Sequence, residues 1–211
     1  MAGTTTNYAW TYPTSTDLVK DGATAIQTAI QGADTTLFTA LGGAYPGMRL
    51  IKSVTVGSAV SSVSVTGAFS STYENYFITI SGLTVSVNTG TMGFLFEDSG
   101  GTALTSGNYG STHYSTMATG TTVAAASINN VGYMECGSLS TASKNYFGFF
   151  VYGPNTVDYK RVTFQSSDTS YTRNGGGYCS NATQFTRFRL QNAGGGTMTG
   201  GTIRVYGIGI S

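Results

Sequence analysis

A helical pattern of hydrophobic residues runs through the first part of the chain. Apolar residues recur at alternating spacings of three and four: Ala23, Ile26, Ile30, Ala33, Leu37 and Ala40. This spacing places them on one face of a helix and forms a heptad-like seam. Asp21 is a suitable N-cap residue, and Gly42 and Gly43 supply a C-terminal stop. The pattern therefore predicts an amphipathic helix over residues 21–41.

This helix is too weak to be stable alone. Its many threonines and the mid-helix Gly32 lower its intrinsic helix propensity, so it needs packing partners. Two partners remain open, its own β domain or copies of itself in a short parallel bundle, and we favour the bundle. The seam residues would be Ile26, Ile30, Ala33 and Leu37. Because Ile at core positions is compatible with three strands, we expect a homotrimer.

After Tyr45 the hydrophobic period changes to two, which is typical of half-buried strands. The alternation is clearest at residues 76–81, 93–98, 160–165 and 185–191. Further strands are expected at residues 49–56, 60–66, 131–136, 146–152 and 201–210. Roughly nine to eleven strands with turns between them predict a mainly β fold, an antiparallel β-sandwich of jelly-roll type. Residues 146–152 are apolar on both faces, which indicates a central strand or an interface.

Three segments between these strands carry no clear strand pattern. Residues 44–47 form a hinge, so we expect two domains: an N-terminal anchor with the oligomerising helix at 1–43 and the β-sandwich at 44–211. Residues 102–130 are rich in Gly, Thr and Ala, and we expect a long loop region with one or two strands. Residues 174–177 are predicted to be a turn because three glycines follow one another.

The N-terminal tail is rich in aromatic residues. Tyr8, Trp10 and Tyr12 lie close together, and Pro13 favours an extended backbone at Tyr12. A short tail cannot bury three aromatic side chains by itself, so they pack on their own domain or insert into a partner. We favour a partner, since aromatic anchors are common at interfaces. Tyr8, Trp10, Tyr12 and Pro13 are therefore the predicted anchor residues.

Composition narrows the class of protein. Only 9% of the 211 residues are charged, but 14 Tyr and 11 Phe indicate a folded chain rather than a disordered one. The net charge of +1 argues against a nucleic-acid-binding protein. We expect no membrane insertion, because no stretch has the ~20 apolar residues of a span. The N-terminus lacks a signal-peptide pattern, so we expect synthesis in a cytoplasm.

Charge is unevenly distributed along the chain. No Lys or Arg occurs between Lys52 and Lys144, a gap that contains Glu97, whereas the C-terminal part is rich in Arg. Acidic strands from the middle therefore pair with basic strands from the end, or the basic part binds a polyanion. We favour the pairing. Cys136 and Cys179 are expected to be reduced and buried, with a disulfide between them as the alternative.

The sequence offers little for catalysis. His113 is the single histidine, and with the two distant cysteines it does not form a recognisable zinc pattern. A glycosidase needs two positioned carboxylates, but Glu97 and Asp98 are adjacent and would point to opposite faces of a strand. We therefore expect no enzyme activity, no catalytic or metal site and no cofactor.

A binding surface is the remaining candidate. Four tyrosines lie among Ser, Gly, Asn and Thr in the predicted loops at 105–130 and 166–184: Tyr109, Tyr114, Tyr171 and Tyr178. Tyrosine with small hydroxyl residues suits recognition of sugars and proteins. One interpretation is that these loops face a receptor. The other is that the tyrosines cap the sandwich or line a subunit interface, and the pattern alone favours this second interpretation.

Several motifs resemble tailed-bacteriophage minor structural proteins of the tail-fibre kind. In the N-terminal region they are Asn7-Tyr8-Ala9-Trp10, Tyr12-Pro13, Asp21-Gly22-Ala23-Thr24-Ala25-Ile26-Gln27 and Asp34-Thr35-Thr36-Leu37. The C-terminal part is similar to the β-sandwich of such proteins at residues 73–81, 176–178 and 200–208. Residues 102–130 contribute little to the resemblance.

The resemblance implies a homotrimeric virion component assembled in the host cytoplasm. Its N-terminus would bind other virion proteins of the tail, baseplate or capsid, and its β-sandwich would face a host surface glycan or protein. No catalytic residues follow from the resemblance. Two alternatives remain: a capsid-attached head fibre or decoration protein, and a polysaccharide-degrading enzyme with carboxylates shared across subunits.

Overall fold

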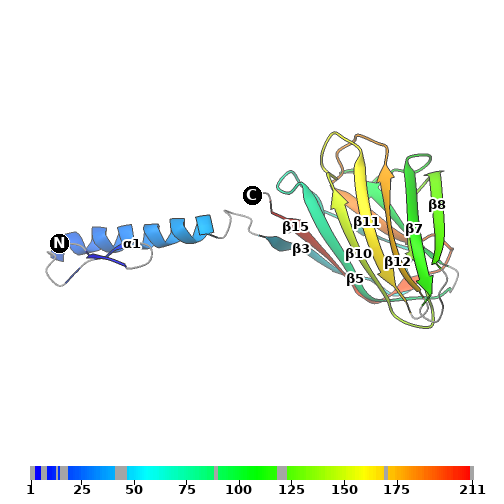
Figure 1. The fold of residues 1–211 in the computed structure, drawn as a ribbon, viewed down its shortest axis with the longest axis horizontal. Helices are drawn as coiled ribbons and strands as arrows, with labels where there is room; N and C mark the ends of the chain where they lie inside the picture. Colours follow the sequence, from blue (N-terminus) through cyan, green and yellow to red (C-terminus); the bar gives the residue numbers. More distant parts are fainter. Residues whose placement is uncertain are drawn as a thin grey trace. The chain divides into compact units, whose positions relative to one another are not determined.

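The computed structural model describes residues 3–5, 9–12, 14, 19–40, 47–87, 90–117, 123–168 and 171–209. It divides into two compact units, one within residues 1–47 and the other from Met48 to Ile210. The described residues form one helix and antiparallel β-sheets (Figure 1). The mainly β fold predicted from the sequence is therefore confirmed.

The N-terminal unit consists of a helix and a small hairpin. Helix α1 (Val19–Ala40) begins two residues before the predicted Asp21, which lies in its first turn. A carboxylate there interacts favourably with the positive end of the helix dipole. The hairpin strands β1 (Gly3–Thr4) and β2 (Thr11–Tyr12) pair antiparallel, and β2 contacts α1 (Figure 1).

Trp10 joins the hairpin to the helix. Its indole Nε1–H donates a hydrogen bond of 2.9 Å to Oγ1 of Thr36. A Cβ atom at Gly32 would lie 3.6 Å from Cδ1 of the Trp10 ring, so the ring lies directly over this glycine. The mid-helix glycine that weakens the isolated helix thus lets the indole approach the helix backbone closely.

The predicted seam of α1 is not covered by this hairpin. The exposed fractions of Ile26, Ile30 and Leu37 are 52%, 65% and 56%, and Ala33 is partly buried. The seam residues lie about 100° around the helix from the face that Trp10 covers, given 3.6 residues per turn. An apolar stripe therefore remains open on the single chain, and its role in a trimer stays a prediction.

The second unit contains two sheets with antiparallel pairing throughout. In spatial order the large sheet contains β3 (Met48–Thr55), β15 (Thr202–Ile208), β5 (Asn75–Val85), β10 (Asn145–Tyr152), β11 (Lys160–Ser167), β12 (Tyr171–Cys179), β7 (Tyr109–Met117) and β8 (Val123–Val131). The small sheet contains β4 (Ser62–Val65), β13 (Arg187–Asn192), β6 (Thr91–Glu97) and β9 (Met134–Ser138), and β14 (Met198–Thr199) pairs with β5. This order is consistent with a β-sandwich, but it does not confirm the predicted jelly-roll connectivity.

Aromatic side chains fill the core between the sheets. Successive strand residues point to opposite faces, and on the core face Phe94 of β6 lies beside both Phe188 of β13 and Phe149 of β10. The rings of Phe94 and Phe188 stack with centroids 5.2 Å apart, and Phe94 lies 5.6 Å from Phe149. Cys136 and Cys179 are buried free thiols in the same core, and burial raises the pKa of both.

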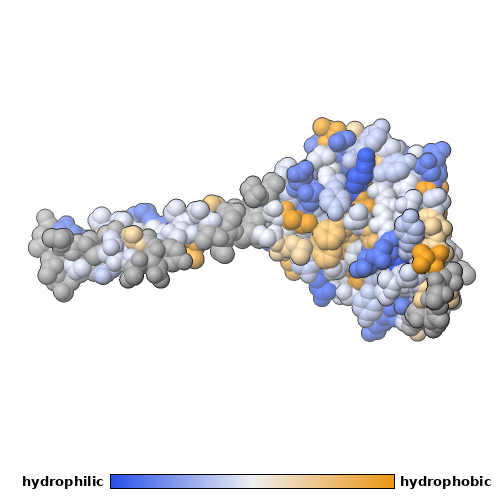
Figure 2. Space-filling view, viewed as in Figure 1, coloured by the Kyte–Doolittle hydropathy of each residue, from blue (hydrophilic) through white to orange (hydrophobic). Residues whose placement is uncertain are grey.

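The outer face of the large sheet carries an apolar row. Cross-strand pairing places Phe150 beside Phe77, Phe77 beside Tyr206, and Tyr206 beside Leu50. The rings of Phe77 and Phe150 are 4.6 Å apart. Figure 2 shows the apolar colour over these strands on the visible face. Strand β10 is therefore apolar on both faces because one faces the core and the other contributes to this apolar row (Leu50, Phe77, Phe150, Tyr206).

Two segments that were predicted to be irregular lie mostly in strands. The one or two strands expected within residues 102–130 are confirmed as β7 and β8, but these nine-residue strands occupy most of a segment that was expected to be mainly loop. Most of β8 is exposed on both faces, so its sequence shows no alternation. Residues 174–177 lie inside β12, paired with β11 on one side and β7 on the other, and do not form a turn.

The predicted pairing of acidic and basic strands is confirmed for Glu97. This fully buried residue on β6 lies beside Arg187 and Arg189 on β13. Its Oε1 is 2.6 Å from Nη2 of Arg189, and its Oε2 is 3.7 Å from Nε of Arg187. Oε1 also accepts a hydrogen bond of 2.9 Å from Oγ of Ser64 on β4. One carboxylate therefore connects three strands of the small sheet.

Candidate binding groove

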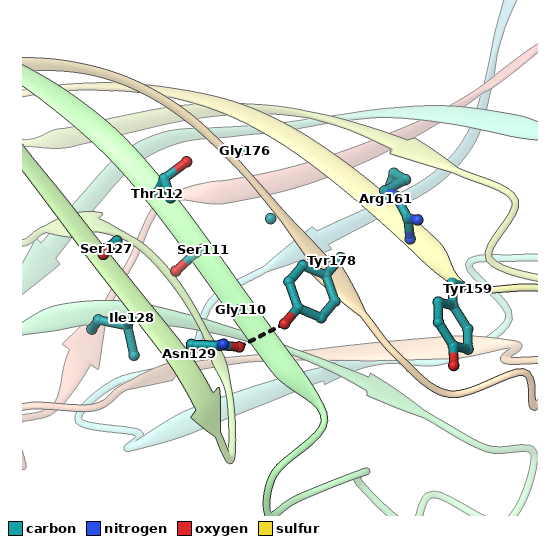
Figure 3. A pocket seen from close by; sticks show the side chains of 11 residues that line it. Gly110, Ser111, Thr112, Ser127, Ile128, Asn129, Tyr159, Arg161, Gly176 and Tyr178 are labelled. Atoms are coloured by element: carbon teal, nitrogen blue, oxygen red, sulfur yellow. Dashed lines mark hydrogen bonds between the residues drawn. The ribbon is translucent and has the colours of Figure 1, made fainter.

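A groove of about 690 Å³ lies on the outer face of the large sheet, over β11, β12, β7 and β8 (Figure 3). Its lining residues are Gly110, Ser111, Thr112, Ser127, Ile128, Asn129, Tyr159, Arg161, Gly176, Gly177 and Tyr178. Two cross-strand rows supply most of them. The first row contains Arg161, Tyr178, Gly110 and Asn129, and the second contains Thr163, Gly176, Thr112 and Ser127.

The floor of the groove exists because Gly176 lacks a side chain. A Cβ atom at Gly176 would have only two neighbours within 4 Å, the carbonyl oxygen of Val162 at 3.3 Å and Cγ2 of Thr163 at 3.8 Å. The space above this position is otherwise open. A side chain at residue 176 would therefore project into the groove.

The glycines on either side of Gly176 are required for a different reason. A Cβ atom at Gly175 would lie 2.5 Å from Cζ of Phe164, and one at Gly177 would lie 2.8 Å from Sδ of Met134. Both positions face the core, where these larger side chains already fill the space. The three consecutive glycines thus allow β12 to pack closely on one face and to form a groove floor on the other.

Tyr178 forms one wall and is held in place. Its hydroxyl group donates a hydrogen bond of 2.6 Å to Oδ1 of Asn129 (Figure 3). The ring passes over Gly110 on the intervening strand, where a Cβ atom would lie 2.5 Å from Cε1 of the ring. Because both ends of the side chain are fixed, Tyr178 presents its ring in a defined orientation.

Tyr159 and Arg161 form a second wall, at the β11 side of the groove (Figure 3). Tyr159 is 52% exposed, and Cζ of the Arg161 guanidinium lies 6.0 Å from the centre of its ring. Nη1 of Arg161 donates a hydrogen bond of 3.2 Å to the carbonyl oxygen of Lys160. Within the part of the chain that the structure describes, no carboxylate lies within 4 Å of this guanidinium. Among the described residues that line the groove, it is the one cationic group.

The groove therefore offers groups for recognition. It combines two tyrosine rings, the hydroxyls of Thr112 and Ser127, an amide and a guanidinium. Convergent polar groups beside aromatic surface are typical of small-molecule and saccharide sites. Among the described residues, no cluster of three or more His, Cys, Asp or Glu side chains could hold a metal ion. His113 lies on the other face of β7, and burial lowers its pKa.

The structure separates the four predicted tyrosines. All four lie on strands rather than in loops. Tyr178 lines the groove, and Tyr114 is 64% exposed on the same outer face but is not part of the groove. Tyr171 lies toward the other face of β12, with its ring 4.5 Å from Cζ of Arg173.

Tyr109, one of the four tyrosines considered for receptor-facing loops, does not reach the surface of the β-sandwich unit. Its side chain is fully buried, and its hydroxyl oxygen accepts a hydrogen bond of 2.8 Å from the backbone N–H of Phe96. Burial raises the pKa of this tyrosine. Tyr109 therefore connects β7 to β6 inside the core.

Sequence reasoning missed Tyr159, Arg161 and Asn129. Arg161 falls within the alternating strand predicted at residues 160–165 but was not proposed as a site residue, and the other two were not singled out. The missing information was strand order, because the groove takes residues from four strands that are neighbours in space. The pair Gly176 and Tyr178, two residues apart on one strand face, was the available signal.

The predicted anchor residues are only partly described. Tyr8 and Pro13 lie outside the described residues. Trp10 packs on α1 of its own chain, whereas Tyr12 is exposed on the hairpin. The binding of a partner by these residues stays a prediction.

No helix of the described residues has the length and apolar character needed to cross a membrane.

The comparisons with known proteins identify no relative. No family model, no curated protein and no solved structure matches the chain.

Proposed function

We propose that the chain is a structural protein of a tailed-phage particle, of the tail-fibre or receptor-binding type, without catalytic activity. The N-terminal unit attaches the protein to other virion proteins, and the β-sandwich unit faces the host surface. The observation that carries the proposal is the groove over β11, β12, β7 and β8. Its tyrosine rings, hydroxyls and guanidinium are suited to binding a surface saccharide.

The homotrimer is part of the proposal. In it, the seams of three α1 helices pack together and remove Ile26, Ile30 and Leu37 from water. The exposure of all three side chains on the single chain supports this arrangement. Burial of such a stripe would stabilise a helix whose composition makes it weak in isolation.

A specific observation favours the second candidate function, a capsid-attached head fibre or decoration protein. The apolar row of the β unit (Leu50, Phe77, Phe150, Tyr206) lies on a solvent-facing sheet. Contiguous exposed apolar surface is typical of a protein interface. Contact between this row and a capsid protein would place the same architecture on the head.

Deletion of residues 1–43 tests the attachment role of the N-terminal unit. We expect the shortened chain to fall at least about tenfold in copies per particle, because a loss of ~1.4 kcal/mol in binding already has this effect. Its β-sandwich should remain folded, since the second unit is compact and contains its own core. Quantitative immunoblots of purified particles and thermal unfolding measure the two effects.

The control for the deletion is the full-length chain with the exposed Val157 changed to Ser. Its copy number should match that of the unaltered chain. Incorporation of the shortened chain at the full-length level would show that the N-terminal unit is not the attachment site.

A further inference from the structure

Arg161 brings an unmatched positive charge to the groove. A guanidinium has five N–H donors, and only Nη1 has a partner among the described residues, the carbonyl oxygen of Lys160. Among the described residues, no carboxylate lies within ion-pair distance of the remaining donors. A planar guanidinium binds a carboxylate through two parallel N–H···O bonds. The natural complement of this wall is therefore a carboxylate.

The two tyrosine rings indicate the kind of ligand that would carry this carboxylate. Tyr178 is in the same cross-strand row as Arg161, on the adjacent strand, and its hydrogen bond to Asn129 holds the ring in place. Tyr159 lies on the other side of Arg161 and is half exposed. An aromatic ring with a polar tip suits a ligand that has both C–H surface and hydroxyl groups. A pyranose ring has both.

The far side of the groove supplies hydrogen-bonding groups for hydroxyls. Thr112 and Ser127 are neighbours in the second row, and Asn129 ends the first row. Hydroxyl and amide groups both donate and accept, as sugar hydroxyls require. From Arg161 to Asn129 the row crosses three strand spacings, about 14 Å at ~4.8 Å each. This span fits a short oligosaccharide better than a single sugar.

From this arrangement we infer that the groove binds an acidic oligosaccharide, one whose sugar rings carry carboxylates. Arg161 binds the carboxylate, Tyr159 and Tyr178 contact the ring face, and the groups on β7 and β8 bind hydroxyls. The groove volume of about 690 Å³ is within the usual range for ligand sites. The inference rests on the proposed function and names the ligand class of the same site.

Binding of the purified full-length chain to defined polymers tests the inference. The probes are polygalacturonate and hyaluronate as uronate polymers, polysialic acid as a nonulosonate polymer, and the carboxyl-reduced form of each. Dextran sulfate serves as a polyanion without carboxylates. We expect binding to at least one carboxylate polymer and at least about tenfold weaker binding to its reduced form. The uronate and nonulosonate probes distinguish the two sources of the carboxylate.

Two variants locate the binding in the groove. Arg161→Gln should weaken binding of the acidic polymer about 10- to 100-fold and leave binding of the reduced form unchanged. Gly176→Leu should abolish binding, because the new side chain fills the groove. Its matched control is Gly148→Leu, an outer-face glycine of β10 outside the groove, where an added Cβ would make only ordinary contacts, the nearest at 3.6 Å. Thermal unfolding confirms that each variant is folded, and Arg161→Gln alters only an exposed side chain.

Three results would overturn the inference. Equal binding to the acidic and reduced polymers would make the ligand a neutral sugar, and equally tight, Arg161-dependent binding of dextran sulfate would show general polyanion binding. Failure to bind any carboxylate polymer would also refute it. None of these results removes the proposed virion role, which depends on incorporation into particles. A chain that binds acidic polymers but is absent from particles would refute the virion role alone.

Discussion

Replacement of Glu97 with Ala is expected to lower the free energy of unfolding by about 3 kcal/mol. Glu97 is fully buried and makes close contacts with Arg189 and Ser64 and a longer one with Arg187. Removal of one partner of a buried ion pair costs about 3–5 kcal/mol, because the remaining charge loses its counter-ion. The two arginine side chains are 22% and 32% exposed, so water can partly solvate them. This solvation places the expected loss of stability at the lower end of that range.

Urea denaturation of the full-length chain measures this effect. Glu74→Ala is the control, since Glu74 is an exposed carboxylate on the same unit, and its cost should stay within about 0.5 kcal/mol. Glu97→Gln keeps the side-chain volume and removes the charge, so it separates ion pairing from packing. A cost for Glu97→Ala no larger than that for Glu74→Ala would show that the three-strand connection does not stabilise the small sheet.

The double variant Ile26→Asn/Ile30→Asn is expected to convert the proposed trimer to monomers. Full burial of one Ile side chain contributes about 1.5–3 kcal/mol. Burial of two such residues on each of three chains therefore contributes about 9–18 kcal/mol to the free energy of trimer formation. Both side chains are more than half exposed on the single chain, so trimer formation has most of this area to bury. Analytical ultracentrifugation should show the molar mass falling about threefold.

The matched control is Gln27→Asn/Gln31→Asn. It introduces the same two asparagines into α1, so it lowers helix propensity, but it changes exposed polar residues away from the seam. This variant should keep the mass of the unaltered chain. A native chain that sediments as a monomer, or an Ile26/Ile30 variant that keeps its full mass, would contradict the proposal that the seam of α1 forms the trimer interface.

The sequence predicted strands well where one face is buried and the other is solvated. On β11, Val162 and Phe164 face the core while Arg161 and Thr163 face water, and the alternation is visible in the sequence. Strand β8 is mostly exposed on both faces, so it lacks this signal. Of the three β12 glycines that signalled a turn, Gly175 and Gly177 are needed because Phe164 and Met134 occupy the space that their side chains would take. That requirement depends on neighbouring strands and is not encoded locally.

The same limit explains which site residues were found. Tyr178 was one of four candidate residues chosen for their tyrosine-rich and glycine-rich context, and it lines the groove. Arg161 and Asn129 come from other strands and meet Tyr178 only through cross-strand register. Tyr109 was misplaced because residues 109–117 were not identified as a strand. With a strand there, its alternation would have separated Tyr109 from Tyr114.

Antibody-gold labelling of intact particles from the source of this chain tests the central claim most directly. The antibody should be raised against the β-sandwich unit, with the preimmune serum as the control. We predict gold at the tail tip or on the fibres. Gold distributed over the head would instead support the head-fibre or decoration role. Particles that carry no gold above the preimmune level would contradict the proposal that the chain is a virion protein.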